Sequence, residues 1–177
     1  ALKGILRPGD RVVTTVLEHN SVVRPLQTLC RERGIEVVPV GAAPDGTLDA
    51  GDLRRALDRP TRLVTVLHAS NVCGVRLPIA EIGALARERG ALFLVDAAQT
   101  AGAFPIDLRR DGIDLLAVPG HKGLLGPQGT GALLLGPGVQ IQGLRQGGTG
   151  TRSESAEHPM ELPQALEAGT PNAPGIA

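Results

Sequence analysis

Residues 62–96, RLVTVLHASNVCGVRLPIAEIGALARERGALFLVD, decide the fold that we predict from this sequence. Arg62 to Leu67 and Ala91 to Val95 are short apolar runs with β-branched residues, as expected of buried strands. Pro78 is expected to open a helix between them, whose apolar residues recur at helical spacing until Gly90. The segment therefore predicts a strand, a crossover helix and a second strand.

The same alternation precedes this segment. Arg11 to Leu17 and Ile35 to Val40 are apolar runs bounded by polar or Gly/Pro residues, and both are predicted to be buried strands. Apolar residues at helical spacing predict one helix from Ser21 to Gly34 and another from Asp49 to Pro60. We find no internal repeat.

An alternation of strands and helices favours parallel pairing, because each crossover helix returns the chain to the same end of the sheet. We therefore predict an α/β fold with three layers, α/β/α, and a mainly parallel sheet. Ligands of such folds bind at the carboxyl ends of the strands, where polar residues become candidates for a site. These residues are Glu18-His19-Asn20, Ala69-Ser70-Asn71, Asp96-Ala97-Ala98-Gln99 and Pro119-Gly120-His121-Lys122.

Length and composition limit the classes of function. We assign the 177 residues to one domain, with residues 143–177 as a loop-rich stretch. The 18 basic and 18 acidic residues balance, which gives no electrostatic case for binding nucleic acid or an anionic membrane. Aromatic residues make up only 1%, so base stacking on aromatic side chains is effectively excluded. We expect a small-molecule partner.

The two cysteines, Cys30 and Cys73, have no metal-ligand spacing and suggest no disulfide framework, so we predict no metal site and a cytoplasmic location. No apolar run approaches the roughly 20 residues that span a bilayer. The first residues lack the layout of a signal peptide, and the absence of an initial Met raises the possibility of a fragment.

Lys122 is the first candidate for chemistry. It stands in the segment DLLAVPGHKGLLGPQGTGALLL, residues 114–135, where a glycine-rich loop separates two apolar runs. Glycines let the backbone turn sharply and approach a ligand closely. A lysine held in such a loop can form a Schiff base with a carbonyl cofactor once its amine is neutral. The alternative is an ordinary solvated surface lysine.

Asp96 and Gln99 follow a strongly apolar strand. A carboxylate at Asp96 can pair with a pyridinium nitrogen, although an Asp there can equally cap a following helix. If Ala97 opens a helical turn, Gln99 faces the same pocket and can orient a phenolic oxygen; otherwise it is an ordinary helix residue.

His19 and Asn71 follow two other strands. The ring of His19 can lie flat against an aromatic ring, or it can serve as a capping or core histidine. Asn71 can donate a hydrogen bond to a substrate carboxylate or ring oxygen, or it can form a local turn. We interpret His68 as structural.

Together these residues describe a pyridoxal phosphate site, and the chain resembles the class V aminotransferase and cysteine desulfurase family over nearly its whole length. Five motifs carry the resemblance: EHNSVVRPL (18–26), SNVCG (70–74), VDAAQTAG (95–102), GHKGLLGPQGTG (120–131) and GGTGTRSE (147–154). The resemblance implies most of the large domain of a fold-type I enzyme, with residues 143–177 leading towards a small domain.

The resemblance also implies residue roles. Lys122 is then the lysine that forms the Schiff base, Asp96 the partner of the pyridine nitrogen, Gln99 the partner of O3′ and His19 the stacking residue. The remaining implied contacts are Asn71 near O3′ and the substrate carboxylate, His121 at the phosphate, and Thr149, whose loop reaches the cofactor phosphate of a second subunit.

The chain departs from the family pattern at Pro119, where desulfurases commonly carry a Ser that helps to hold the phosphate; Pro offers neither hydroxyl nor N–H. The family's Gly-Thr phosphate loop is expected before Ala1, and its persulfide cysteine and carboxylate-binding arginine after Ala177. Neither Cys30 nor Cys73 matches that nucleophile, and these residues alone are expected to lack turnover.

The resemblance implies a homodimer that removes sulfur from cysteine, leaving alanine, with a possible sulfur-acceptor protein. One alternative is transamination or another amino-acid lyase reaction with the same cofactor. A nucleotide-binding α/β module and a non-catalytic truncated remnant are the alternatives from other classes. No G-x-G-x-x-G follows the first strand, which argues against the nucleotide-binding module.

Overall fold

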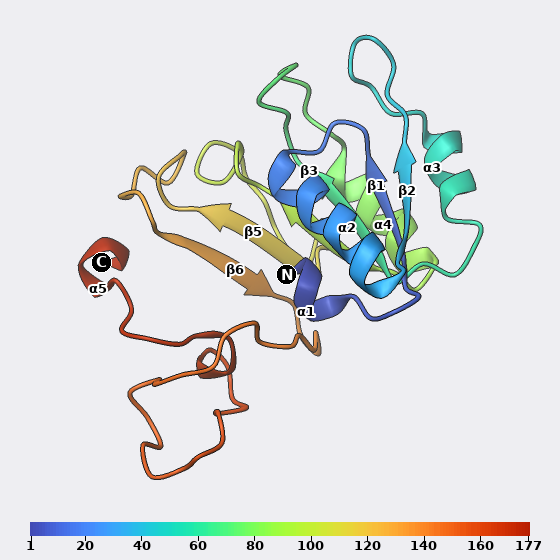
Figure 1. The fold of residues 1–177 in the computed structure, drawn as a ribbon. Helices are drawn as coiled ribbons and strands as arrows, with labels where there is room; N and C mark the ends of the chain where they lie inside the picture. Colours follow the sequence, from blue (N-terminus) through green and yellow to red (C-terminus); the bar gives the residue numbers. More distant parts are fainter.

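The computed structural model describes residues 1–177 and contains one six-stranded sheet in the order β2-β1-β3-β4-β5-β6 (Figure 1). Neighbouring strands run parallel except β5 and β6, which are antiparallel. The strands are β1 (Arg11–Thr15), β2 (Glu36–Val40), β3 (Leu63–Leu67), β4 (Leu92–Asp96), β5 (Leu115–Pro119) and β6 (Gly131–Leu135). The helices are α1 (Leu2–Ile5), α2 (Asn20–Arg33), α3 (Ala50–Ala56), α4 (Ile79–Glu88) and α5 (Ala173–Ile176), with a 3-10 turn at Gln164–Leu166.

Every predicted strand is present, but the first is shorter than predicted. The expected strand reached Leu17, whereas β1 ends at Thr15. The hydroxyl of Thr15 accepts a hydrogen bond from the Leu17 N–H at 3.2 Å, which turns the chain before Leu17 can continue the strand. The apolar run therefore outlasts the strand by two residues because Val16 and Leu17 belong to this turn.

The helices agree with the predicted ones to within a few residues, and their ends follow from local capping. His19 caps α2 by accepting the Ser21 N–H, and Gly34 ends this helix in the left-handed conformation with φ 61°. Asp49 caps α3 by accepting the Asp52 N–H, and α3 ends at Ala56, before Pro60.

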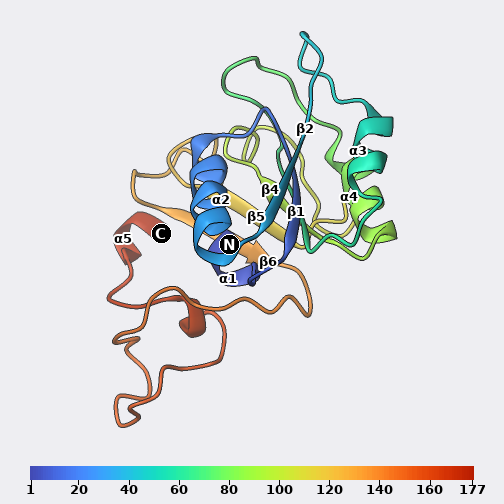
Figure 2. The same cartoon turned by 45° about the vertical axis from the view of Figure 1, so that its right-hand side comes forward.

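The helices cover both faces of the sheet, and the predicted three-layer α/β/α arrangement is confirmed. Figure 2 shows α2 on one side of the strands and α3 and α4 on the other. Successive residues of each strand point to opposite faces of the sheet and so pack against different helices. One cluster joins Val12, Leu63 and Leu94 to α1 and α2, and the other joins Val13, Val64 and Phe93 to α3 and α4.

The direction of strand order reverses between β1 and β3. From β1 the chain crosses through α2 to β2, and it then crosses back through α3 to β3 on the other side of β1. Because α2, which follows β1, and α4, which follows β3, lie on opposite faces, the loops after β1 and β3 separate and leave a crevice at the carboxyl edge. This reversal predicts the location of a ligand site.

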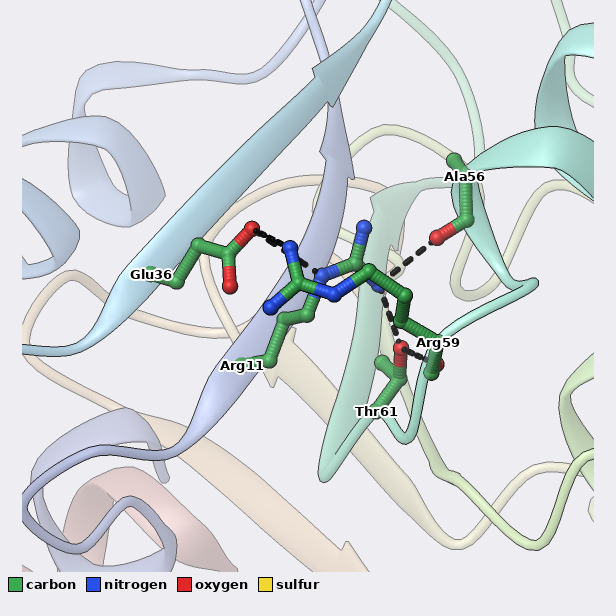
Figure 3. A network of polar contacts seen from close by, with 5 residues as sticks. All are labelled: Arg11, Glu36, Ala56, Arg59 and Thr61. Carbon is green, nitrogen blue, oxygen red and sulfur yellow. Dashed lines mark hydrogen bonds and ion pairs between the residues drawn. The ribbon is translucent and has the colours of Figure 1, made fainter.

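The opposite, amino edge of the sheet carries a buried charge. Arg11, at the start of β1, donates to the Ala56 carbonyl at 2.6 Å and the Thr61 hydroxyl at 2.7 Å (Figure 3). Its Nε also donates to Glu36 at 3.3 Å, and the same carboxylate oxygen accepts from Arg59 at 2.8 Å. The network joins β1, β2 and the end of α3, so we interpret it as structural.

Beyond β6 the chain forms only the 3-10 turn and α5, and it runs beside the sheet rather than adding to it (Figure 1). Whether residues 143–177 lead towards a second domain stays a prediction. No helix combines the length and apolar character needed to cross a membrane.

Candidate active site at the carboxyl edge of the sheet

A cavity of about 880 Å³ lies at the carboxyl ends of the strands. It has the size of a small-molecule site, for which about 300–1,000 Å³ is typical. Six of the seven predicted site residues line it: His19, Asn71, Asp96, Gln99, His121 and Lys122. These residues come from four segments that are far apart in sequence. The topology therefore assembles most of the predicted site in one place.

The loop that carries Lys122 is a closed connection between β5 and β6. The Gly120 N–H donates to the Thr130 carbonyl at 2.8 Å, and the Gly126 N–H donates to the Gly120 carbonyl at 2.8 Å. A Cβ on Gly120 would overlap the Thr130 hydroxyl, so this position requires glycine. The loop is thereby fixed at its base.

The same loop lies directly against the turn that follows β4. A Cβ on Gly123 would overlap the Ala101 carbonyl, and a Cβ on Gly102 would overlap the Gly123 carbonyl. Gly102 also has φ +81°, a conformation that residues with a side chain rarely adopt. The glycines of this loop were expected to allow close approach of a ligand. In the structure, Gly123 and Gly102 instead allow two backbone segments to pack against each other. This contact holds the Lys122 loop next to the Asp96–Gln99 turn.

Lys122 itself is half-buried, and its amine makes no hydrogen bond or ion pair within the chain. The loop is closed beneath it because the Leu125 N–H donates to the Lys122 carbonyl at 2.9 Å. An amine without a carboxylate partner, carried by a half-buried residue, is available to react with a carbonyl group. The role of Lys122 in forming a Schiff base stays a prediction.

No helix follows β4, so Asp96 does not cap a helix, but it stabilises the turn that comes next. Its Oδ1 accepts the Ala98 N–H at 2.9 Å and so stabilises the turn after β4. Its Oδ2 has no hydrogen-bond partner within the chain, and the residue lines the cavity. The turn continues through hydrogen bonds from Thr100 and Ala101 to the Ala97 carbonyl, which places Gln99 at the same cavity as expected.

His19 and Asn71 line the cavity from opposite sides of the crevice. The Nδ1 of His19 accepts the Ser21 N–H at 3.1 Å, so the imidazole is both the cap of α2 and part of the cavity wall. This bond fixes the ring and leaves Nε2 without a partner. Asn71 follows β3 in an exposed turn, and its side-chain amide makes no hydrogen bond within the chain.

Thr149 is the predicted site residue that does not line this cavity. It belongs to a separate hollow of about 1530 Å³ beside α1, and its hydroxyl lies 3.1 Å from that of Thr151. The expected role of Thr149 at a second subunit stays a prediction. Pro119, at the end of β5, does line the cavity that Lys122 shares.

Sequence reasoning missed Glu18. Its buried carboxyl accepts hydrogen bonds at Oε1 from the Thr15 hydroxyl at 2.6 Å and the Leu67 N–H at 3.1 Å, whereas Oε2 is buried without a partner. Burial raises the pKa of Glu18 to about 7, and the negative charge of Asp96 adds to this rise. Glu18 belongs to the polar triplet Glu18-His19-Asn20 that follows β1. The position of this triplet after a strand could have identified Glu18, but only His19 was chosen from it as a candidate.

The remaining polar candidates lie outside the cavity. His68 is buried, and burial lowers the pKa of its imidazole, in accord with a structural role. Cys30 packs against the cluster of α1 and α2. Cys73 is exposed, and a hydrogen bond with Ser70 lowers the pKa of its thiol. Neither cysteine lines the cavity beside Lys122.

A family model described as Aminotransferase class-V matches residues 1–177. A probable cysteine desulfurase of Methanothermobacter thermautotrophicus is 45% identical over 175 residues, which cover 96% of this chain and 43% of that protein. The apo structure of a cysteine desulfurase from Thermococcus onnurineus NA1 has a TM-score of 0.88 at 34% identity, over 97% of this chain and 44% of that one. SspA in complex with cysteine has a TM-score of 0.81 at 28% identity, over 95% of this chain and 45% of that one. This chain therefore spans less than half the length of the proteins that it resembles.

Proposed function

Because this chain belongs to the class-V aminotransferase family, we propose that the protein uses pyridoxal phosphate to remove sulfur from cysteine. Cysteine desulfurases and other members of this family use that cofactor. The observation that carries the proposal is the convergence of Lys122, Asp96 and four further polar side chains on one cavity.

The side chains in the cavity fit the ring of the cofactor. The amine of Lys122, a half-buried residue, suits its carbonyl carbon, and the unpartnered Oδ2 of Asp96 suits its ring nitrogen. Gln99 supplies an amide for the phenolic oxygen, and the ring of His19 supplies a flat surface held by its bond to Ser21. The atoms of these four side chains that would contact the cofactor ring make no hydrogen bond or ion pair within the chain.

When bound, pyridoxal phosphate supplies an electron sink for negative charge at the α-carbon of an amino acid. The residues of the chain support this chemistry in separate ways. The Asp96 carboxylate keeps a proton on the ring nitrogen, because a nearby negative charge favours the protonated base. Asn71 would bind the substrate carboxylate, and the amine of Lys122 would accept the proton from the α-carbon.

The phosphate end has fewer donors within this chain. His121 lines the cavity and is our candidate for the phosphate, whereas Pro119 contributes no N–H or hydroxyl. Thr149 lies in the separate hollow, and we propose that it reaches the phosphate of a second subunit in a homodimer, as the resemblance implies. We include that dimer, a sulfur-acceptor protein and a cytoplasmic location in the proposal.

Cysteine is proposed as the substrate from the names of similar proteins. The relative from Methanothermobacter thermautotrophicus is named a probable cysteine desulfurase, and SspA was solved in complex with cysteine. The family match favours this class of function over a nucleotide-binding module, and it gives no preference to a non-catalytic remnant.

Borohydride trapping tests the cofactor site in the protein expressed from its complete gene. After pyridoxal phosphate is added and the linkage reduced, peptide mapping is expected to place the label on Lys122, and Lys122→Ala is expected to abolish it. Lys3 is a matched control because it also lines the cavity, so Lys3→Ala should keep the label. Label on Lys3 and Lys122 alike, or none, contradicts the proposal.

Product analysis tests the reaction. Incubation with cysteine is expected to yield alanine in equal amount to the sulfur released, with no added oxoacid. A requirement for an oxoacid, with its conversion to an amino acid, would instead identify transamination.

A further inference from the structure

β1 and β3 separate towards the carboxyl edge of the sheet. Their register contains only Val12 with Leu63 and Val13 with Val64. Beyond this point β1 stays with β2, since Thr15 pairs with Val40 and the Val16 N–H donates to the Val40 carbonyl at 3.0 Å. The last part of β3 therefore has no backbone partner on its β1 side.

The Leu67 N–H faces this gap. Successive N–H groups of a central strand point to opposite neighbours, and the next one, of His68, donates to the Asp96 carbonyl on β4 at 2.9 Å. The Leu67 N–H is satisfied by the carboxyl of Glu18 instead of a β1 carbonyl, at 3.1 Å. The same oxygen accepts from the Thr15 hydroxyl at 2.6 Å. One side chain thus bridges the split between the two strands.

The bridge connects two walls of the cavity. Glu18 directly precedes His19, and Leu67 is the register partner of Asp96 in the pairing of β3 with β4. His19, Leu67 and Asp96 all line the cavity. A change in length or loss of the Glu18 side chain is therefore expected to alter the spacing between the histidine ring and the aspartate carboxylate.

We propose that Glu18 is a positioning residue that sets the separation of His19 from Asp96 across the split between β1 and β3. The inference rests on the proposed function, because these two residues define where the cofactor ring would lie. Glu18 is 9% exposed, and the Oε2 atom of its carboxyl is buried without a hydrogen-bond partner. Burying such an oxygen costs free energy, and groups of this kind gather at functional sites.

The test compares Glu18→Ala with Asp111→Ala in the protein expressed from its complete gene. Asp111 is a matched control, because its carboxyl is also buried and also accepts a backbone N–H. That N–H belongs to Asp107, which does not line the cavity, whereas Glu18 accepts from Leu67, which does. Pyridoxal phosphate is titrated by visible absorbance to obtain its dissociation constant, and visible circular dichroism reports the setting of the bound ring. Urea unfolding without the cofactor gives the stability of each variant.

Glu18→Ala is expected to raise the dissociation constant about tenfold, a typical cost for losing a partner one layer behind a bound group, and to change the circular dichroism. Glu18→Gln keeps an oxygen acceptor for the Leu67 N–H, so its dissociation constant and circular dichroism are expected to match those of the unchanged protein. Asp111→Ala is expected to lower stability while leaving both readouts as in the unchanged protein.

Two results overturn the inference: unchanged binding and circular dichroism in Glu18→Ala, or equal changes in Asp111→Ala. If Glu18→Ala does not fold, Glu18→Asp replaces it, because its side chain is one methylene too short to span the same gap. Absence of cofactor binding by the unchanged protein overturns the proposed function as well, whereas binding with an unaffected Glu18 variant overturns only the positioning role.

Discussion

Gly102→Ala is expected to displace the Lys122 loop from the Asp96–Gln99 turn. The alanine methyl would overlap the Gly123 carbonyl and come within 2.9 Å of the Leu124 nitrogen. At φ +81° the side chain also incurs the left-handed penalty of about 1–2 kcal/mol. Moving the facing backbone adds about 1–3 kcal/mol, as for other overpacked contacts.

Gly90→Ala separates these two contributions. Gly90 ends the segment after α4 with φ +66°, and a Cβ there has nothing within 4 Å. This variant therefore incurs the left-handed penalty without the overlap. Urea unfolding should show Gly102→Ala to be less stable than Gly90→Ala by about 1–3 kcal/mol, the cost of the overlap alone.

The same pair of variants connects this contact to the site. With pyridoxal phosphate and borohydride, Gly102→Ala should trap less cofactor on Lys122, because the loop no longer lies beside Asp96. Gly90→Ala should trap as much as the unchanged protein. Equal stabilities and equal trapping in the two variants would refute the argument that the glycine contact positions Lys122.

Two further predictions concern the buried charges. Arg11→Ala should lower the free energy of unfolding by about 2–3 kcal/mol through loss of hydrogen bonds to Ala56 and Thr61, without changing the affinity for pyridoxal phosphate. Arg54→Ala, which removes an exposed pair with Glu88 at 4.0 Å, should cost less than about 1 kcal/mol, and an equal loss in both would contradict the buried network. Glu18 makes cofactor-free stability depend on pH, because the folded protein keeps its proton up to about 7 while the unfolded chain releases it near 4.5. Stability should therefore fall by roughly 3 kcal/mol as pH rises through this range, relative to Glu18→Gln, and parallel unfolding curves for the two would exclude the raised pKa.

The sequence predicted the elements of the fold well because their signals are local. Apolar runs of strand length and helical spacing between Asp49 and Pro60 or Pro78 and Gly90 depend on neighbours a few residues away. The end of β1 was placed too late, at Leu17, because the turn made by Thr15 depends on one side-chain hydroxyl. An apolar run predicts which residues are buried, but buried residues can continue beyond the last residue of a strand. The run therefore does not define where the strand ends.

The site was partly predictable for a different reason. Polar residues after parallel strands meet at one edge whatever the details of packing, so His19, Asn71, Asp96 and Lys122 converge as expected. Their spacing was not predictable, because it depends on contacts between distant backbones. Nothing in the neighbourhood of Gly102 indicates that Gly123 will lie against it.

Glu18 illustrates the same limit at the centre of the sheet. The need for a side-chain acceptor at the Leu67 N–H arises only because β1 and β3 separate. They separate because α2, which follows β1, and α4, which follows β3, lie on opposite faces of the sheet. The reversal that opens a crevice for a ligand therefore also removes a backbone acceptor at its floor. A carboxyl from the β1 loop can supply that acceptor only by being buried beside Asp96, which accounts for its raised pKa. The crevice and its buried acid thus have one topological cause.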